Sequence, residues 1–240
     1  MKSIITFIAV AFLSFNAVAE VNSSQKQALI DLYNSTNGAE WNNTWDLNAD
    51  VSTWYGVRVV NNAVVGLNLS MNNLSGQLPE SLGNLESLVT LEMFFNKLQG
   101  TIPSSIGNLK NLKVLVLNGN LLDGKLPESL YKLNKLEQLM LTSNNLSGSL
   151  SDKLENLNNL QVLNLFDNNI NGELPLAILK LENLKELNLS NNEMYGALPE
   201  GLNAMPNLKS IALAENNFNN NTDGYALNNF ESKSTIASNE

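Results

Sequence analysis

The sequence contains no cysteine and no histidine, and these two absences remove much of the chemistry that enzymes use. Without cysteine the chain has no disulfide bond, thiol nucleophile or iron–sulfur cluster. Without histidine it lacks the usual general base and the commonest metal ligand at neutral pH. We therefore expect no metal site and no cofactor. Any catalysis would depend on carboxylates, lysine, tyrosine, serine or threonine.

Positive charge is also scarce. The chain of 240 residues has 14 lysines and arginines against 23 aspartates and glutamates, which gives a formal net charge of −9. So acidic a chain offers little to the phosphates of a nucleic acid and is repelled by anionic lipid surfaces. We expect no nucleic-acid partner.

One long apolar run is present, and it lies at the start of the chain. Residues 1–19 combine Lys2, an apolar stretch over 4–15 and Ala-Val-Ala at 17–19, the pattern of a secretory signal peptide cleaved before Glu20. A membrane anchor is disfavoured because the run is short and has no charged flank after it. Since no second long apolar run follows, we expect a mature chain without a membrane span. It would be secreted, either extracellular or, in a bacterium with two membranes, periplasmic.

Asparagine and leucine each make up nearly a fifth of the chain. Such a bias predicts a repeat that requires these two residue types at fixed places. From Val64 onward the sequence repeats seven times with a period of 24 residues, with apolar residues at positions 1, 4 and 6 of each unit and glycine at position 13 of the first six. Position 9 is asparagine in every unit: Asn72, Asn96, Asn120, Asn144, Asn168, Asn192 and Asn216.

The spacing of the repeat predicts its structure. Apolar residues at positions 4 and 6 alternate with a period of two, which indicates a short strand at the start of each unit. A single strand has no partner within its own unit, so successive units must stack into one parallel sheet. Glycine at position 13 and proline at position 16 exclude long helices from the other side, where we expect extended segments and 3₁₀ turns. The asparagine at position 9 can satisfy backbone groups where the chain turns inward, which predicts a ladder of amides from coil to coil.

The unit LxxLxLxxNxLxGxLPxxLGNLxxL, seen in Leu88–Asn111 as LVTLEMFFNKLQGTIPSSIGNLKN, resembles the plant-specific class of leucine-rich repeat. That class includes the ectodomains of plant receptor kinases and polygalacturonase-inhibiting proteins, and similar repeats occur in exported bacterial proteins. The resemblance implies an α/β repeat fold, a right-handed solenoid with a concave parallel sheet, and ligand binding on the concave face. The sequence departs from the pattern where Ser151 replaces the proline, where Tyr131 and Glu155 replace the glycine of LGNL, and where Asn220 replaces the position-13 glycine.

We divide the mature chain into a cap, the repeats and a tail. Residues 20–63 form the predicted N-terminal cap, which resembles the caps of bacterial leucine-rich-repeat proteins. It would contain a helix over 24–34, capped by Ser23 or Ser24, and a hairpin that begins at 57–60. The repeats fill residues 64–220, and residues 221–240 form a terminal cap or tail. Three tryptophans could offer a platform for carbohydrate, but we favour a role in the core of the cap because the end of a repeat core needs cover. They are Trp41, Trp45 and Trp54.

The repeat does not fix the residue type at every position, and we expect binding residues at the positions that vary. Positions 3, 5 and 7 of each unit project from the sheet onto the concave face, and most hold small or polar residues. β-Propensity alone would account for apolar residues there. An apolar patch with aromatic members and a polar rim is more often a contact site, so we predict that it binds a protein or glycan ligand. The predicted patch consists of Phe94, Phe95, Val114, Val116, Met140, Val162 and Phe166.

The carboxylates of the concave face argue against catalysis, and we predict no catalytic residue. Glycoside hydrolysis needs two carboxylates about 5–10 Å apart. Glu92 and Glu186 are four units apart, which corresponds to roughly 19 Å, and Asp167 and Glu215 are about 10 Å apart without an apolar pocket. We therefore predict an exported, non-catalytic recognition module. The alternative suggested by the resemblance is an inhibitor of a secreted hydrolase, and a glycan-active enzyme is a remote third possibility.

Overall fold

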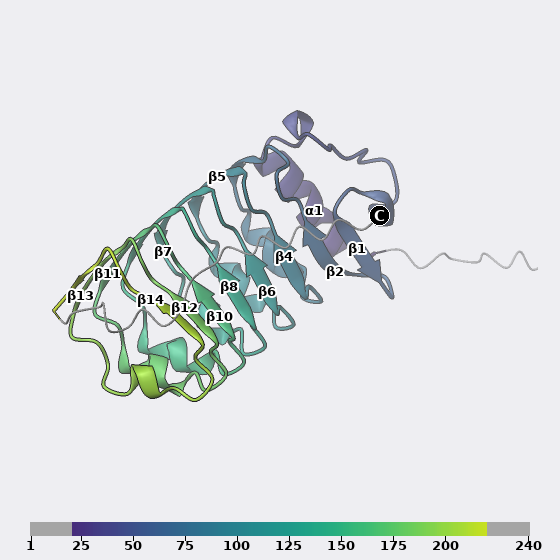
Figure 1. Cartoon of the computed structure of the whole chain (residues 1–240). Coiled ribbons are helices and arrows are strands. Elements are labelled where there is room, and N and C mark those ends of the chain that lie inside the picture. The colour runs from purple at the N-terminus through teal and green to yellow at the C-terminus, as the bar shows by residue number, and fades with distance from the viewer. Residues whose placement is uncertain (1–20, 220–240) are drawn as a thin grey trace, which may run out of the picture.

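The computed structural model describes residues 21–219, so the predicted signal peptide, the tail and Asn220 lie outside the described residues. It shows a helical cap followed by seven stacked coils, each of which begins at the first position of its repeat. Figure 1 shows the strands of successive coils side by side along the molecule. The predicted solenoid with a helix-plus-hairpin cap is confirmed. In residues 21–219 no helix is long and apolar enough to cross a membrane.

The first sheet has eight strands in the order β1-β2-β4-β6-β8-β10-β12-β14. β1 and β2 form an antiparallel hairpin, and Asn61 and Asn62 in its turn have positive φ angles of 48° and 62°, as a type I′ turn requires. All other neighbours are parallel and pair equivalent positions of consecutive repeats. The strands are β1 (Val57–Val60), β2 (Ala63–Asn68), β4 (Thr90–Glu92), β6 (Val114–Val116), β8 (Gln138–Met140), β10 (Val162–Asn164), β12 (Glu186–Asn188) and β14 (Ser210–Ala212).

A second parallel sheet of seven strands follows the position-9 asparagines, where the sequence had predicted only extended segments. Six of these short strands include the glycine at position 13, which has a positive φ, as at Gly100 with 70°. Its strands are β3 (Ser75–Gln77), β5 (Lys97–Thr101), β7 (Leu121–Lys125), β9 (Asn145–Gly148), β11 (Asn169–Gly172), β13 (Glu193–Gly196) and β15 (Asn217–Phe218).

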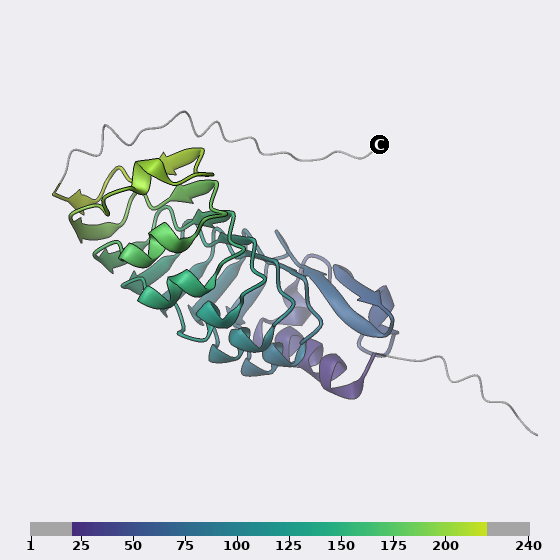
Figure 2. The same ribbon diagram turned by 90° about the horizontal axis from the view of Figure 1, so that it is seen from below.

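Short 3₁₀ helices form the outer, convex side of the coils, in agreement with the sequence. Figure 2 shows them in a row beside the N-terminal helix. Pro79, Pro103 and Pro175 each precede such a helix with an extended backbone, which stops a longer helix from forming. The 3₁₀ helices are η3 (Glu80–Asn84), η4 (Ser104–Asn108), η5 (Leu130–Lys132), η6 (Asp152–Asn156), η7 (Leu176–Lys180) and η8 (Leu202–Ala204).

The cap begins with α1 (Ser23–Ser35) and continues through η1 (Gly38–Glu40) and η2 (Val51–Thr53). The N-cap of α1 is Asn22, whose side chain accepts a hydrogen bond from the backbone N–H of Gln25. The prediction of Ser23 or Ser24 as the N-cap was wrong. The three tryptophans of the cap are buried, and each indole N–H donates to a backbone carbonyl within the cap. The three rings of Trp41, Trp45 and Trp54 pack together with centroids 4.8 and 4.7 Å apart. They are core residues, so they offer no platform to a carbohydrate.

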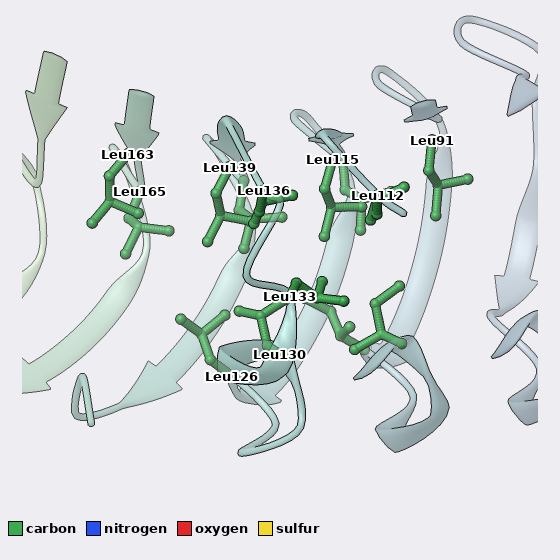
Figure 3. Close-up of a cluster of buried hydrophobic side chains, with 14 of the residues drawn as sticks. Leu91, Leu112, Leu115, Leu126, Leu130, Leu133, Leu136, Leu139, Leu163 and Leu165 are labelled. Carbon is green, nitrogen blue, oxygen red and sulfur yellow. The ribbon is translucent and has the colours of Figure 1, made fainter. Parts of the chain in front are cut away.

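One apolar core runs from the cap to the last coil. Figure 3 shows leucines of successive coils directed into the space enclosed by each turn, among them Leu115 and Leu139 from the first sheet and Leu130 from a 3₁₀ helix. These three side chains are 0–1% exposed. Each buried leucine contributes about 1.5–3 kcal/mol, and with no disulfide in the chain this packing is the main source of stability.

Candidate binding surface on the concave face

The position-9 asparagines hold the chain where it leaves the first sheet. In coil 4, Nδ2 of Asn144 donates to the carbonyls of Leu117 and Leu141 at 3.1 and 3.0 Å, and Oδ1 accepts the N–H of Leu122 at 3.1 Å. Asn72 instead exchanges hydrogen bonds with the backbone of Asn43 in the cap. The pattern of Asn144 recurs at Asn96, Asn120, Asn168, Asn192 and Asn216. Because neighbouring coils are tied together at this point, the residues just before it have fixed directions.

Four of the predicted ligand-binding residues lie on strands of the first sheet. Val114 and Val116 flank the buried Leu115 in β6. Met140 follows Leu139 in β8, and the fourth of them, Val162, opens β10. All four are half-buried and alternate with core leucines, so they face away from the core and form part of the concave face.

The predicted phenylalanines follow the strands. Phe94 and Phe166 occupy position 7 of their coils, half-buried and exposed respectively. Phe95 lies in the turn at position 8, with a φ of 51° and 60% of its surface exposed. Its ring meets that of Phe94 edge to face, with centroids 5.6 Å apart. It also covers Gly119 of the next coil so closely that a Cβ atom there would lie 2.4 Å from the ring of Phe95.

Polar residues interrupt the predicted patch. Gln138 of β8 pairs with both Val114 and Val162 and therefore separates them. Asn118 and Thr142 hold position 7 in the two coils between Phe94 and Phe166. Equivalent positions touch only in consecutive coils, so apolar residues form a continuous patch only where consecutive coils both carry them. The larger part, here called the apolar cluster, consists of Phe94, Phe95, Val114, Val116 and Met140 in coils 2–4.

Sequence reasoning missed two exposed apolar residues beside this cluster. Met71, 59% exposed, is the position-8 residue of coil 1 and has a φ of 56°, like Phe95 one coil later. Leu121, 52% exposed, opens β7. In the later coils position 8 holds glycine, serine, aspartate, asparagine or glutamate. Bulky apolar residues at that position in the first two coils were the signal that could have revealed this edge.

Met71 and Phe95 line a shallow depression between the cap and coil 2, with a volume of about 270 Å³. Its other walls are polar, and Lys97 among them donates to Oδ1 of Asn73 at 2.8 Å. The depression is completed by Asn42, Asn73, Asn96 and Lys97. An open hollow with two exposed apolar walls is suited to a single side chain of a ligand rather than to an enclosed small molecule.

The outward positions of the seven coils give the concave face a negative charge. Positions 3, 5, 7 and 8 of the seven coils hold four carboxylates and no lysine or arginine. Two ion pairs occur in residues 21–219, Lys113–Glu137 and Lys153–Glu128, and neither includes any of these carboxylates. Arg58 of β1, opposite Gly66, is the cation at the cap end of this face. The four carboxylates are Glu92, Asp167, Glu186 and Glu215.

The four carboxylates are dispersed over the concave face. Glu92 in β4 and Glu186 in β12 are separated by three strands, which places them roughly 19 Å apart. Glu92 accepts a hydrogen bond from Nδ2 of Asn68, and Asp167 accepts one from Nδ2 of Asn191, each at 2.6 Å. Over residues 21–219, no group of three or more acidic side chains is placed to hold a metal ion.

The coils match known repeat families. Residues 95–146 match one family described as leucine rich repeat, and residues 64–85, 159–181 and 183–205 match a second family of the same description. Together these matches cover half of the chain. A comparison with curated proteins found no match.

Solved structures resemble the fold closely. The PEPR1–AtPEP1 crystal structure is 30% identical with a TM-score of 0.76, over 82% of this chain and 29% of that one. A plant ice-binding protein is 26% identical with a TM-score of 0.74, over 83% and 73%. The Arabidopsis receptor kinase HAESA, in complex with the peptide hormone IDA and the co-receptor SERK1, is 26% identical with a TM-score of 0.53, over 82% and 42%.

The chain thus spans less than a third of the PEPR1 structure's chain and less than half of HAESA's. What these proteins share with it is the stack of coils. The repeat matches, the two parallel sheets and these structural likenesses agree, and the chain belongs to the leucine-rich repeat proteins.

Proposed function

We propose that the protein is an exported, non-catalytic recognition module that binds an extended peptide segment along its concave face. The observation that carries this proposal is the apolar cluster together with Met71. These six exposed or half-buried apolar side chains gather in coils 1–4 of a face whose other outward positions are mostly small or polar. Exposed aromatic groups inside a polar rim are typical of contact surfaces.

Two further features support a peptide as the ligand. One of the similar structures is that of the receptor kinase HAESA, which contains the peptide hormone IDA. The face is also prebuilt, because the asparagine ladder and the leucine core fix each strand before any ligand arrives. A rigid surface loses little conformational entropy on binding, so a modest contact area can give useful affinity.

Another of the similar structures is that of a plant ice-binding protein, which is 26% identical to this chain. This likeness supports the fold. The apolar cluster with Met71 is the feature that favours a peptide as the ligand.

The proposal can be tested by selecting binders from a random 12-residue peptide library with the purified chain. Selected peptides should lose at least tenfold in affinity when Phe94 and Phe95 are both changed to serine. The matched control is Leu176→Ser, which removes an exposed apolar side chain, 69% exposed, from the convex side. Burial of one aromatic side chain in a contact is worth about 1.5–3 kcal/mol, which sets the tenfold threshold.

Two results would contradict the proposal. The first is peptide binding that survives both phenylalanine changes but is lost with Leu176→Ser, which would place the site on the convex side. The second is a chain that selects no peptide yet binds glycans or blocks a secreted hydrolase in parallel assays, which would favour the alternatives.

A further inference from the structure

We infer that the peptide recognised by the concave face carries one aromatic or aliphatic side chain and, four to seven residues away, positively charged side chains. This inference rests on the proposed function and adds the chemistry of the ligand. It follows from an asymmetry along the solenoid. On this face, coils 1–3 hold most of the exposed apolar side chains, whereas coils 5–7 hold three of the four carboxylates. The fourth, Glu92 of coil 2, accepts a hydrogen bond from Asn68.

The apolar end is the depression lined by Met71 and Phe95. Both residues are held in the left-handed region, which bulky L-residues avoid at a cost of about 1–2 kcal/mol, and both leave most of their surface in water. Phe94 packs edge to face against Phe95 and extends the apolar surface onto the sheet. A side chain of the ligand that fills this hollow would remove apolar surface of both partners from water.

The charged end comprises Asp167 and Glu215, at position 8 of coils 5 and 7 beyond the ends of the strands, and Glu186, which opens β12 in coil 6. None of them takes part in either ion pair found in residues 21–219. Lysines lie at the other edge of the sheet, before the strands, and Lys185 among them donates to Oε1 of Gln161 at 2.8 Å. The outward positions of these coils therefore hold negative charge, and a cationic segment complements them.

The spacing of the coils fixes the separation of the two features in the ligand. Coil 5 lies three strand spacings from coil 2, about 14 Å, and coil 7 lies five spacings away, about 24 Å. An extended chain advances about 3.3 Å per residue, so these distances correspond to about four and about seven residues. A ligand of this kind crosses the parallel strands and follows the long axis of the solenoid seen in Figure 1.

The test uses synthetic labelled peptides with one phenylalanine, a glycine–serine spacer and two lysines, with the spacer varied from one to twelve residues. A second series replaces the lysines by glutamates. Fluorescence anisotropy with the whole chain should show tightest binding at a separation of about four to seven residues. It should also show at least a tenfold preference for lysine at low salt that shrinks as salt is added.

The triple variant Asp167→Asn, Glu186→Gln, Glu215→Gln should lose that preference. The control removes the same charge from exposed residues outside the sheet face, in the variant Glu155→Gln, Glu182→Gln, Glu200→Gln, and should keep it. Phe95→Ser should weaken both series equally, since it removes the anchor and not the charge.

The outcomes separate the inference from the proposed function. Equal binding of the two series, or a preference that survives the triple variant, overturns the inference while the proposed function stands, provided that binding still requires Phe94 and Phe95. Binding that does not depend on the spacer length overturns the predicted separation. If neither series nor the random library yields any binder, both the inference and the proposed function fail.

Discussion

The two faces of the first sheet differ in how much their residue types vary from coil to coil. In β8, Leu139 points into the core with 1% of its surface exposed, while its neighbours Gln138 and Met140 face outward. The inward residue at this position is leucine in six coils and isoleucine in the seventh, whereas position 5 holds Asn, Glu, Val, Met or Ala. Each coil must fit the next at a strand spacing of about 4.8 Å, so its interior repeats one shape. The comparison teaches that the repeated residues maintain the fold and that recognition has to lie among the varied ones.

The repeated and the varied residues should differ most in their contribution to the free energy of unfolding, and the adjacent residues Asn144 and Asn145 test this difference. Asn144 is buried and satisfies three backbone groups, whereas the side chain of Asn145 is exposed. Asn144→Ala should lower the free energy of unfolding by about 1–3 kcal/mol because it leaves those groups unpaired. Asn145→Ala should change it by less than about 0.5 kcal/mol. Chemical denaturation of both variants measures the difference, and equal losses would contradict the structural role of the ladder.

A smaller effect is expected where the repeat itself departs from its pattern. Tyr131 replaces a glycine and is buried, and its hydroxyl accepts the N–H of Ser151 at 3.3 Å. Ser151 replaces a proline and so supplies an N–H that proline lacks. Burial raises the pKa of Tyr131, and the hydrogen bond from Ser151 partly offsets that rise. The two departures therefore form one matched pair that joins coils 3 and 4.

Tyr131→Phe should cost about 0.5–1.5 kcal/mol because it removes this hydrogen bond. In a Ser151→Pro background, where the donor is already absent, the same change should cost less. A double-mutant cycle from denaturation curves gives the coupling free energy. Additive effects would show that the two residues departed from the repeat independently.

At Met71 and Phe95 we expect substitutions to weaken peptide binding without lowering stability. Met71 and Phe95 have the left-handed backbone that Asn191 adopts at the equivalent position of coil 6, with a φ of 55°. Asparagine tolerates this conformation well. The variant Met71→Asn, Phe95→Asn should therefore leave the free energy of unfolding unchanged or raise it by up to about 1 kcal/mol. It should bind selected peptides at least tenfold more weakly.

Thermal melts and peptide titrations of the same samples check both halves of this prediction. A loss of more than about 2 kcal/mol would show that the two side chains are core residues, because only buried apolar groups carry such costs. Unchanged peptide binding would show that Met71 and Phe95 are not part of the binding site.

These contrasts explain which features the sequence could predict. Leucine and asparagine spacing determines the coils because a buried position tolerates few residue types, and the same reasoning placed Trp41, Trp45 and Trp54 in the core of the cap. The N-cap was misplaced by one or two residues, because several polar residues adjoin the helix and only the geometry shows that Asn22 reaches the N–H of Gln25. The second sheet was missed because two or three extended residues between an asparagine and a glycine have no pattern of their own.

The candidate site was harder to predict because it depends on contacts between coils. Phe94 and Phe166 are both apolar at position 7, yet the residues beside them in space are Asn118 and Thr142, which lie a full repeat away in sequence. Met71 escaped notice because its exposure arises from a left-handed turn and not from strand alternation. Periodicity describes what the coils share. The exposure and contacts of residues that differ between coils depend on their neighbours in three dimensions, which periodicity does not give.

The smallest effect is expected on the convex side, where a hydrogen bond between coils is open to water. The carboxylate of Glu80 accepts the backbone N–H groups of Ser104 and Ser105, the first two residues of η4 one coil on, at 3.0 and 2.8 Å. Partial desolvation acts to raise the pKa of Glu80, but the hydrogen bonds from Ser105 and Ser104 outweigh it and the pKa is lowered from 4.5. The ionised form is therefore the one that stabilises the fold. This contribution is complete well above pH 4.5 and is lost as the pH falls through the lowered pKa.

Because Glu80 is exposed, solvent screening limits its contribution to a few tenths of a kcal/mol. Glu80→Gln should therefore melt slightly below the wild-type protein at pH 7, and the two curves should converge as the pH is lowered toward 3. Glu86→Gln, at an exposed carboxylate of the same coil, is the control and should follow the wild-type protein throughout. A difference for Glu80→Gln that persists or grows at low pH would show that the ionised carboxylate is not what joins these two coils. The convex hydrogen bond would then have to be assigned to the neutral side chain, and the contrast with the buried ladder at Asn144 would rest on burial alone.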